Sequence, residues 1–176
     1  NNPMMMKSLI SLTFMFLHAI LSQCSVVAGD SDLITKTCKQ TPYYELCVST
    51  LQSEPRSRSA DITGLGLIIV DVVKAKATGT VKQIKKLKRS NPQLRDPLSK
   101  CSEFYNTVVI ADIPEAVEAL TKGDPKFAED GMSDTAREAQ DCQNNFKHFK
   151  SKPLTDMNKA VHDLSVVATS IIRMLL

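Results

Sequence analysis

The feature that most constrains this chain is an apolar repeat at alternating steps of three and four residues, which extends from residue 60 to residue 175. This period places apolar side chains on one face of an α-helix, whereas a half-buried β-strand has a period of two. The repeat is clearest in the last segment, at Leu154, Met157, Val161, Leu164, Ala168, Ile171 and Leu175. Because breaks divide it into four long segments joined by short loops, we predict an all-α protein with an up-down-up-down four-helix bundle over residues 59–176.

Prolines indicate how these segments are divided. The first helix is expected to end at Asn91-Pro92, and Pro153 separates the third helix from the fourth. Pro114 falls inside the second helix, where it cannot donate a hydrogen bond to Ile110. Because the apolar spacing resumes in phase at Ala116, we predict a kink near residues 110–114 and not a helix end.

The first 29 residues have the pattern of a secretory signal peptide. Lys7 precedes an apolar run over residues 9–21, and Val26 and Ala28 suit the −3 and −1 positions of a cleavage site. The run is shorter than the roughly 20 apolar residues that a membrane span needs. Residues 1–3 precede the first methionine and could derive from the clone. We therefore predict an exported chain over residues 30–176, with no membrane segment in the mature form.

The predicted mature chain has a nearly balanced charge and an aliphatic core. Lys7 is the only charged residue of the leader, so 21 basic and 19 acidic residues remain. This balance neither favours nor excludes a charged partner. The remaining 147 residues are enough for one domain, and without tryptophan its core must be mainly aliphatic.

Four cysteines follow the leader, which itself contains Cys24: Cys38, Cys47, Cys101 and Cys142. An even set in an exported chain predicts two disulfides. Cys101 lies 22 residues before Gly123 and Cys142 lies 19 after it. In an antiparallel helix pair both are about 30 Å from the turn, which predicts the pairs Cys101–Cys142 and Cys38–Cys47. Metal binding is the alternative, but no Cys-x-x-Cys pair supports it, and we predict no metal or cofactor.

The segment over residues 30–58 is expected to form a small helical hairpin and a connector. Two short helices, Thr35–Lys39 and Tyr43–Leu51, are separated by Pro42 and held together by the Cys38–Cys47 disulfide. A polar connector containing Pro55 follows. A hairpin this small cannot bury its own apolar residues, so we expect it to pack against the bundle.

The sequence offers little for catalysis. His148 and His162 have no neighbour at a spacing typical of a catalytic or metal site, and Gly64-Leu65-Gly66 is too short for a phosphate loop. Asp134 and Glu138 are expected on an exposed helix face, with ordinary acidity. We predict that the protein is not an enzyme.

A basic cluster ends the first long helix: Lys82, Lys85, Lys86, Lys88 and Arg89. We interpret it as a solvated face whose cations suit a helix C-terminus. Binding to an acidic wall polymer or to nucleic acid is the alternative. The cluster lacks interleaved aromatic residues, which disfavours nucleic acid.

The turn between the second and third helices has the sequence Gly-Asp-Pro-Lys-Phe-Ala-Glu-Asp-Gly over residues 123–131. Gly123 suits a left-handed helix end, Asp124 can cap the next helix with its carboxylate, and Pro125 suits the first helical position. Turn chemistry does not explain Lys126 and Phe127. A cation in the first turn opposes the helix dipole, although Glu129 and Asp130 can offset it.

The leader, the Cys-x8-Cys hairpin, the interhelical disulfide and the run over residues 119–132 together resemble the plant invertase and pectin methylesterase inhibitor family. Pro125-Lys126-Phe127 is similar to the motif with which the cell-wall and vacuolar invertase inhibitors of this family enter the enzyme's active site. The resemblance implies a secreted inhibitor of plant acid invertase in the cell wall (apoplast) or the vacuole. It also implies that Asp124, Pro125, Lys126 and Phe127 contact the target.

The implied mechanism is chemically reasonable, because a glycoside hydrolase holds paired carboxylates in its pocket. Lys126 would pair with them, and Phe127 would cover the mouth of the pocket. The hypothesis fails if the Phe127 ring is buried in its own protein and the Lys126 ammonium is held in a local ion pair. Two other functions stay open: inhibition of pectin methylesterase through the long bundle faces, and a non-inhibitory binding or storage protein or allergen on the same scaffold.

Overall fold

The computed structural model describes residues 32–176, so the predicted leader over residues 1–29 lies outside the described residues. A short helix over residues 32–38 is followed by α2 (Tyr44–Ser53), the 3₁₀ turn η1 (Pro55–Ser59) and α3 (Ile62–Ser90). The second half contains η2 (Pro92–Leu94), α4 (Arg95–Thr107), η3 (Val108–Asp112), α5 (Ile113–Lys122), α6 (Pro125–Asn144) and α7 (Thr155–Arg173). None of the helices in this part of the chain is long and apolar enough to span a membrane.

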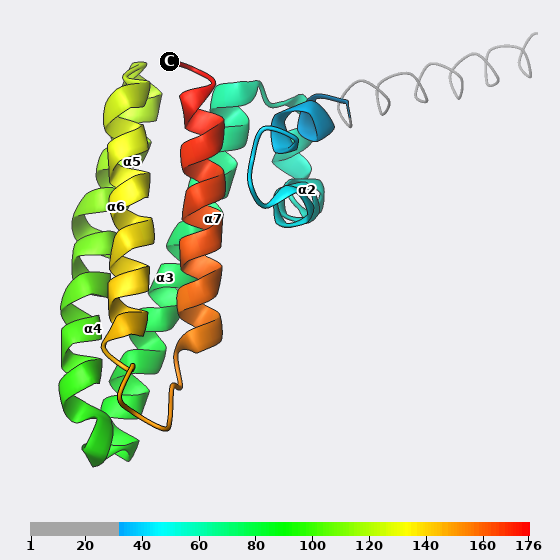
Figure 1. Cartoon of the computed structure of the whole chain (residues 1–176). Helices are drawn as coiled ribbons and strands as arrows, with labels where there is room; N and C mark the ends of the chain where they lie inside the picture. The colour runs from blue at the N-terminus through cyan, green and yellow to red at the C-terminus, as the bar shows by residue number, and fades with distance from the viewer. Residues whose placement is uncertain (1–31) are drawn as a thin grey trace, which may run out of the picture.

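The four long segments form the predicted up-down-up-down bundle. Figure 1 shows α3, the continuous rod of α4, η3 and α5, then α6 and α7, running alongside one another. Each rod packs on its neighbour in the chain, and α7 closes the bundle by packing on α3. The turn between α5 and α6 lies at the same end as the C-terminus, whereas the α3–α4 turn and the α6–α7 loop lie at the opposite end (Figure 1).

The ends of the first long helix follow from local chemistry. Asp61 caps α3, because its Oδ1 accepts a hydrogen bond from the Gly64 backbone amide at 2.8 Å. Asn91 ends α3 immediately before Pro92, as predicted. The buried side chains between these ends are mainly aliphatic, with Leu65 and Ile69 fully inaccessible to solvent.

The second rod passes Pro114 without stopping, as the apolar spacing predicted. Before Pro114 the regular α-helical hydrogen bonding is interrupted by a π turn over Val108–Asp112. In this turn the Ile113 backbone amide donates to the Val108 carbonyl five residues earlier. A π turn shifts the hydrogen-bond register of a helix by one residue. The missing amide hydrogen of Pro114 is therefore accommodated inside a continuous rod.

Both predicted disulfides are present. Cys101 and Cys142 join α4 to α6 with their Cα atoms 4.7 Å apart, and Cys38 and Cys47 close the hairpin with a Cα separation of 5.5 Å. The hairpin packs on the bundle through half-buried residues that include Tyr43 and Leu46. The predicted connector is more regular than expected, since α2 continues to Ser53 and η1 occupies residues 55–59.

Candidate functional site at the turn between α5 and α6

The backbone of the α5–α6 turn is held by hydrogen bonds. Gly123 has φ 78° and ψ 30°, the left-handed conformation that glycine adopts without strain. The Asp124 amide donates back to the Ala119 carbonyl at 2.8 Å, which closes the end of α5. Pro125 then begins α6 at a position that needs no amide hydrogen. The turn therefore holds the end of α5 and the start of α6 in a fixed relative orientation.

Asp124 differs from the prediction made for it. It occupies the N-cap position of α6, but its side chain accepts no capping hydrogen bond. With φ −113° and ψ 75°, its backbone lies outside the extended conformation that is usual for a capping residue. Its carbonyl still accepts the ordinary first hydrogen bond of the helix, from the Ala128 amide at 3.5 Å. The exposed carboxylate of Asp124 is therefore not used in capping α6.

Lys126 projects from the first turn of α6 and is held by two carboxylates. Its Nζ lies 2.8 Å from Glu129 Oε2 and 2.9 Å from Asp130 Oδ1, and these hydrogen bonds raise the pKa of Lys126. The side chain nevertheless stays 60% exposed. The ammonium group thus remains accessible to solvent while Glu129 and Asp130 offset its position at the positive end of the helix dipole.

Glu129 links this turn to the end of the chain. Its side chain is only 10% exposed, and its Oε1 accepts a hydrogen bond from Arg173 Nε of α7 at 2.5 Å. The hydrogen bonds from Lys126 and then from Arg173 lower the pKa of Glu129. One mostly buried carboxylate is therefore compensated by two cations from different helices.

Phe127 points away from the core. It is 55% exposed, whereas the next residue, Ala128, is fully buried. The ring lines a hollow of about 370 Å³ together with Glu118, Lys122 and other residues of α5. The side chains of Glu118 and Lys122 form an ion pair beside it. An exposed ring and an exposed ammonium group on consecutive residues give this turn, which we call the tip, an amphipathic surface.

This geometry meets only one of the two conditions under which the active-site hypothesis would fail. The Lys126 ammonium is held in local ion pairs, but the Phe127 ring is not buried. Sequence reasoning missed Arg173, which lies 44 residues beyond Glu129. The up-down order of the helices does place the end of the fourth helix beside the start of the third, and that is the signal by which it could have been found.

A second cluster, between η3 and α6, corrects the expected acidity of Glu138. Glu138 is half-buried, and burial together with the charge of Asp112 raises its pKa to about 8. Burial also raises the pKa of Asp112, with Asp134 and Glu115 adding negative charge nearby. Asp112 Oδ2 and Glu138 Oε2 have no hydrogen-bond partner among the described residues. The pair therefore tends to hold one proton at neutral pH, and Glu138 carries it.

Another hollow, of about 630 Å³, lies where the hairpin meets α7 and is lined in part by Tyr43, Lys159 and Asp163. The Asp163 side chain is 8% exposed and pairs with both Lys159 and His162 Nδ1, the latter at 2.8 Å. Lys159 also lies 5.8 Å from the centre of the Tyr43 ring. The ion pairs lie within α7, whereas the contact between Lys159 and Tyr43 joins the hairpin to α7. Together they do not form a nucleophilic site. Nor do the described residues contain a group of three or more residues that could hold a metal.

Comparison with known proteins then identifies the family. Residues 32–171 match the family described as plant invertase/pectin methylesterase inhibitor. The chain belongs to this family. It is a family of proteinaceous inhibitors, which confirms that the chain is not an enzyme.

Among its relatives, the chain is 44% identical over 145 residues to "Cell wall / vacuolar inhibitor of fructosidase 1" of Arabidopsis thaliana, covering 82% of this chain and 70% of that protein. It is also 37% identical over 106 residues to "Pectinesterase inhibitor" of Actinidia deliciosa, covering 59% of this chain and 57% of that protein. Both branches of the family are thus represented among its relatives.

Solved structures confirm the fold. A mutant form of a pectin methylesterase inhibitor from Arabidopsis superposes with a TM-score of 0.71 at 22% identity, covering 79% of this chain and 94% of the other. A pectin methylesterase inhibitor from Arabidopsis thaliana superposes with a TM-score of 0.63, also at 22% identity, covering 81% and 95%. The helical bundle of the described residues is therefore the fold of these two inhibitors.

Proposed function

We propose that this protein is a secreted inhibitor of an acid invertase, and that Lys126 and Phe127 enter the active site of the enzyme. The observation that carries the proposal is the exposure of the Phe127 ring beside Lys126, on a turn held by Gly123 and Pro125. A large exposed aromatic next to a cation is typical of the few residues that supply most of the binding energy of an interface. The 44% identical relative named an inhibitor of fructosidase supports the same assignment.

The ion pairs of Lys126 are compatible with this role. An invertase pocket contains paired carboxylates, so Lys126 would exchange the carboxylates of Glu129 and Asp130 for those of the enzyme. Asp130 is exposed and is solvated after the exchange. Glu129 is mostly buried, but it keeps the Arg173 hydrogen bond when Lys126 leaves. The chain therefore contains the second cation that makes the exchange possible at low cost.

The rigidity of the turn would reduce the cost of binding. Gly123 and Pro125 fix the backbone on both sides of Asp124, and the Cys101–Cys142 disulfide ties the two supporting rods together. A loop that is already ordered loses less conformational entropy when it binds.

The same proposal covers location. The leader pattern over residues 1–29, the two disulfides and a relative named as a cell wall/vacuolar inhibitor support export to the cell wall or the vacuole. The partner would then be an acid invertase of one of these compartments.

The test is inhibition of a purified cell-wall invertase by Lys126→Ala and Phe127→Ala. We expect each substitution to weaken inhibition at least tenfold, as is usual for a residue at the centre of an interface. Matched controls are Lys74→Ala, an exposed lysine on α3, and Ile110→Ala, an exposed apolar residue of η3. Full inhibition by both tip variants, with helicity unchanged, would reject the proposal.

Inhibition of pectin methylesterase is the second candidate, because a 37% identical relative is named a pectinesterase inhibitor. It is expected to use the long bundle faces, so the tip substitutions would leave it unchanged. Assays of every variant against both enzymes separate the two functions. Failure of the unmodified chain in both assays would favour a non-inhibitory binding protein or allergen on this scaffold.

A further inference from the structure

The charges of this protein are divided between the two ends of its bundle. The end opposite the tip consists of the α3–α4 turn with its flanking helix ends, residues 82–100, and the α6–α7 loop, residues 145–153. These two segments, which we call the basic end, carry eight lysines, two arginines and a single acidic residue, Asp96. The rest of the described chain carries eleven basic and seventeen acidic residues. A net charge near zero thus hides a strong charge separation along the bundle axis.

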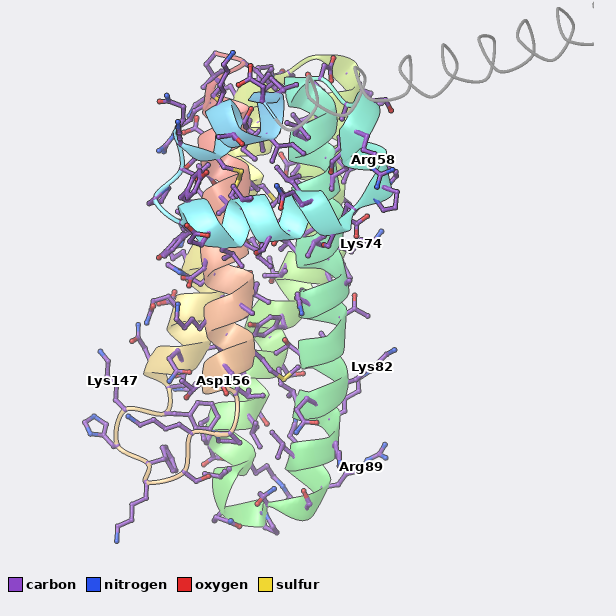
Figure 2. All side chains as sticks on the ribbon, turned by 90° about the vertical axis from the view of Figure 1, so that its right-hand side faces the viewer. Arg58, Lys74, Lys82, Arg89, Lys147 and Asp156 are labelled. Carbon is purple, nitrogen blue, oxygen red and sulfur yellow. A yellow bond between two sulfur atoms is a disulfide. The ribbon has the colours of Figure 1, made fainter. Side chains whose placement is uncertain are left out.

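Figure 1 shows that the α3–α4 turn and the α6–α7 loop lie at the same end of the bundle. In Figure 2, Lys82 and Arg89 project from the lower part of α3, and Lys147 projects from the α6–α7 loop at the same end. Arg58 and Lys74 lie nearer the opposite end (Figure 2). Two segments far apart in sequence therefore contribute to one basic surface, which Asp156 of the first turn of α7 borders.

The cations of the basic end are not used within the protein. None of the ten forms an ion pair with a described residue, whereas seven of the other eleven cations do. Nine of the ten are exposed, and Lys88 is half-buried. Their charges are therefore available to a partner.

Helix dipoles explain the positions of only some cations of the basic end. Lys88 and Arg89 lie in the last turn of α3, where a cation is favourable. Arg95, by contrast, is the first residue of α4, where a cation opposes the dipole, and the three loop lysines belong to no helix. Lys82, Lys85, Lys86 and Arg89 also line a shallow hollow of about 490 Å³. A binding surface accounts for the residues that the dipole leaves unexplained.

We propose that the basic end binds a linear acidic polysaccharide, a polyuronide with one carboxylate on each sugar, and so holds the inhibitor on an acidic wall matrix with its tip facing away. Eight of the ten cations are lysines, which act as point charges and suit single carboxylates spaced along a polymer. The net negative charge of the rest of the molecule orients the tip away from a polyanion.

Two other polyanions fit this surface less well. Binding of single-stranded nucleic acid without sequence preference uses aromatic side chains on which bases stack. The large exposed apolar side chains of the described residues are Ile110, Phe127 and Leu176, all outside the basic end. The same absence removes the apolar anchor that would hold a helix at a lipid surface. The basic end therefore best fits a polysaccharide that binds through its charges alone, without stacked bases or an apolar anchor.

The test is binding of the full mature chain to immobilised polygalacturonate at about pH 6, where uronic carboxyl groups are ionised. The test variant carries Lys82→Gln, Lys85→Gln, Lys86→Gln and Arg89→Gln. The matched control carries Lys39→Gln, Arg58→Gln, Lys74→Gln and Lys76→Gln, which are also exposed and also form no ion pair among the described residues. Each variant loses four positive charges, so the two have the same net charge.

We expect the unmodified chain to bind at about 50 mM salt and to be released at about 500 mM salt, because screening weakens exposed charge pairs. The test variant should lose affinity about tenfold or more, while the control changes less than about threefold. Fully methyl-esterified polymer should not bind. Inhibition of invertase by the test variant should be unchanged, which separates this proposal from the proposed function.

Three results would overturn the proposal. The first is no binding of the unmodified chain at low salt. The second is an equal loss of affinity in both variants, since net charge alone would then explain binding. The third is tighter binding to single- or double-stranded RNA, or to vesicles of an anionic phospholipid, than to polygalacturonate.

Discussion

Glu129 at the start of α6 and Arg173 at the end of α7 are joined by a hydrogen bond of 2.5 Å between Oε1 and Nε. The other carboxylate oxygen of Glu129 accepts a hydrogen bond from Lys126. The same carboxylate therefore binds both the proposed contact residue and the last turn of α7. Arg173 is therefore expected to control how easily Lys126 leaves for a target carboxylate.

Replacing Arg173 with Met tests this coupling. In Arg173→Met, the mostly buried Glu129 retains Lys126 as its hydrogen-bond partner, so transfer of Lys126 to the enzyme leaves a carboxylate uncompensated. We expect inhibition of invertase to weaken about three- to tenfold without any change in residues 124–127. Arg137→Met is the control, because Arg137 pairs with a more exposed carboxylate, that of Asp134. Equal inhibition by both variants would show that Arg173 does not assist the exchange.

The Asp112–Glu138 pair predicts how stability depends on pH. Glu138 has a pKa of about 8 in the folded chain and an ordinary value of 4.5. The folded chain therefore keeps a proton that the unfolded chain releases, so stability falls as pH rises between these values and levels off above about pH 8. We expect a loss on the order of 1 to 2 kcal/mol from this pair, because both groups keep some contact with solvent.

Glu138→Gln should remove this loss. Urea unfolding at about pH 5 and about pH 8 measures it, and the variant should gain stability relative to the unmodified chain only at the higher pH. Glu103→Gln, at an exposed position on α4, is the control and should show no such difference. A stability difference for Glu138→Gln that is the same at both pH values would contradict the assignment.

Gly131 sets how closely the π turn approaches α6. A Cβ atom at Gly131 would lie 2.8 Å from the Asp112 carbonyl oxygen and 3.4 Å from the Ala116 Cβ. Because the nearest atom belongs to the backbone, Gly131→Ala should force the rods apart and destabilise the protein by about 1 to 3 kcal/mol.

Gly79→Ala is the matched control for this prediction. It also lies within a long helix, but its Cβ would meet only the Met157 Cε at 4.0 Å. We expect a gain of up to about 1 kcal/mol from the better helix propensity of alanine. Chemical denaturation of both variants makes the comparison, and a Gly131→Ala variant as stable as Gly79→Ala would disprove the close approach.

The two disulfides should differ in their effect on stability. The Cys101–Cys142 bond closes 41 residues and the Cys38–Cys47 bond closes 9. From loop entropy, paired Cys→Ala replacements should cost about 4 kcal/mol for the longer loop and about 2.5 kcal/mol for the shorter one. Thermal and urea unfolding of the two double variants measures the difference. A larger loss from the hairpin disulfide would mean that native contacts, and not loop length, dominate.

The elements of the bundle could be predicted from the sequence because each depends on neighbouring residues. The apolar period gave the helices, Asn91-Pro92 gave the end of α3, and Gly123 gave the left-handed turn. The Cys101–Cys142 pair followed from equal distances to that turn. All of these are set by residues within one helix, or within one helix pair and its turn.

Contacts between helices could not be predicted in the same way, because they depend on how each helix is rotated about its axis. The apolar pattern of α6 predicted that Glu138 lies on an exposed face. The π turn, however, shifts the register of the second rod and brings Asp112 toward Glu138. The carboxylate cap expected at Asp124 is absent, since its backbone does not adopt the extended conformation that is usual for a capping residue. Local sequence patterns predict the helices, but they do not determine the rotation and backbone geometry that set these contacts.

The central claim, that the α5–α6 tip enters the active site of an invertase, is tested most directly by site-specific photo-cross-linking. Phe127→p-benzoylphenylalanine replaces an exposed ring with a photoreactive ring, and Ile110→p-benzoylphenylalanine is an exposed control on η3. We predict that position 127 cross-links beside the catalytic carboxylates of the enzyme and that excess substrate suppresses the product. Cross-linking from position 110 with none from position 127, or a product that substrate does not suppress, would contradict the claim.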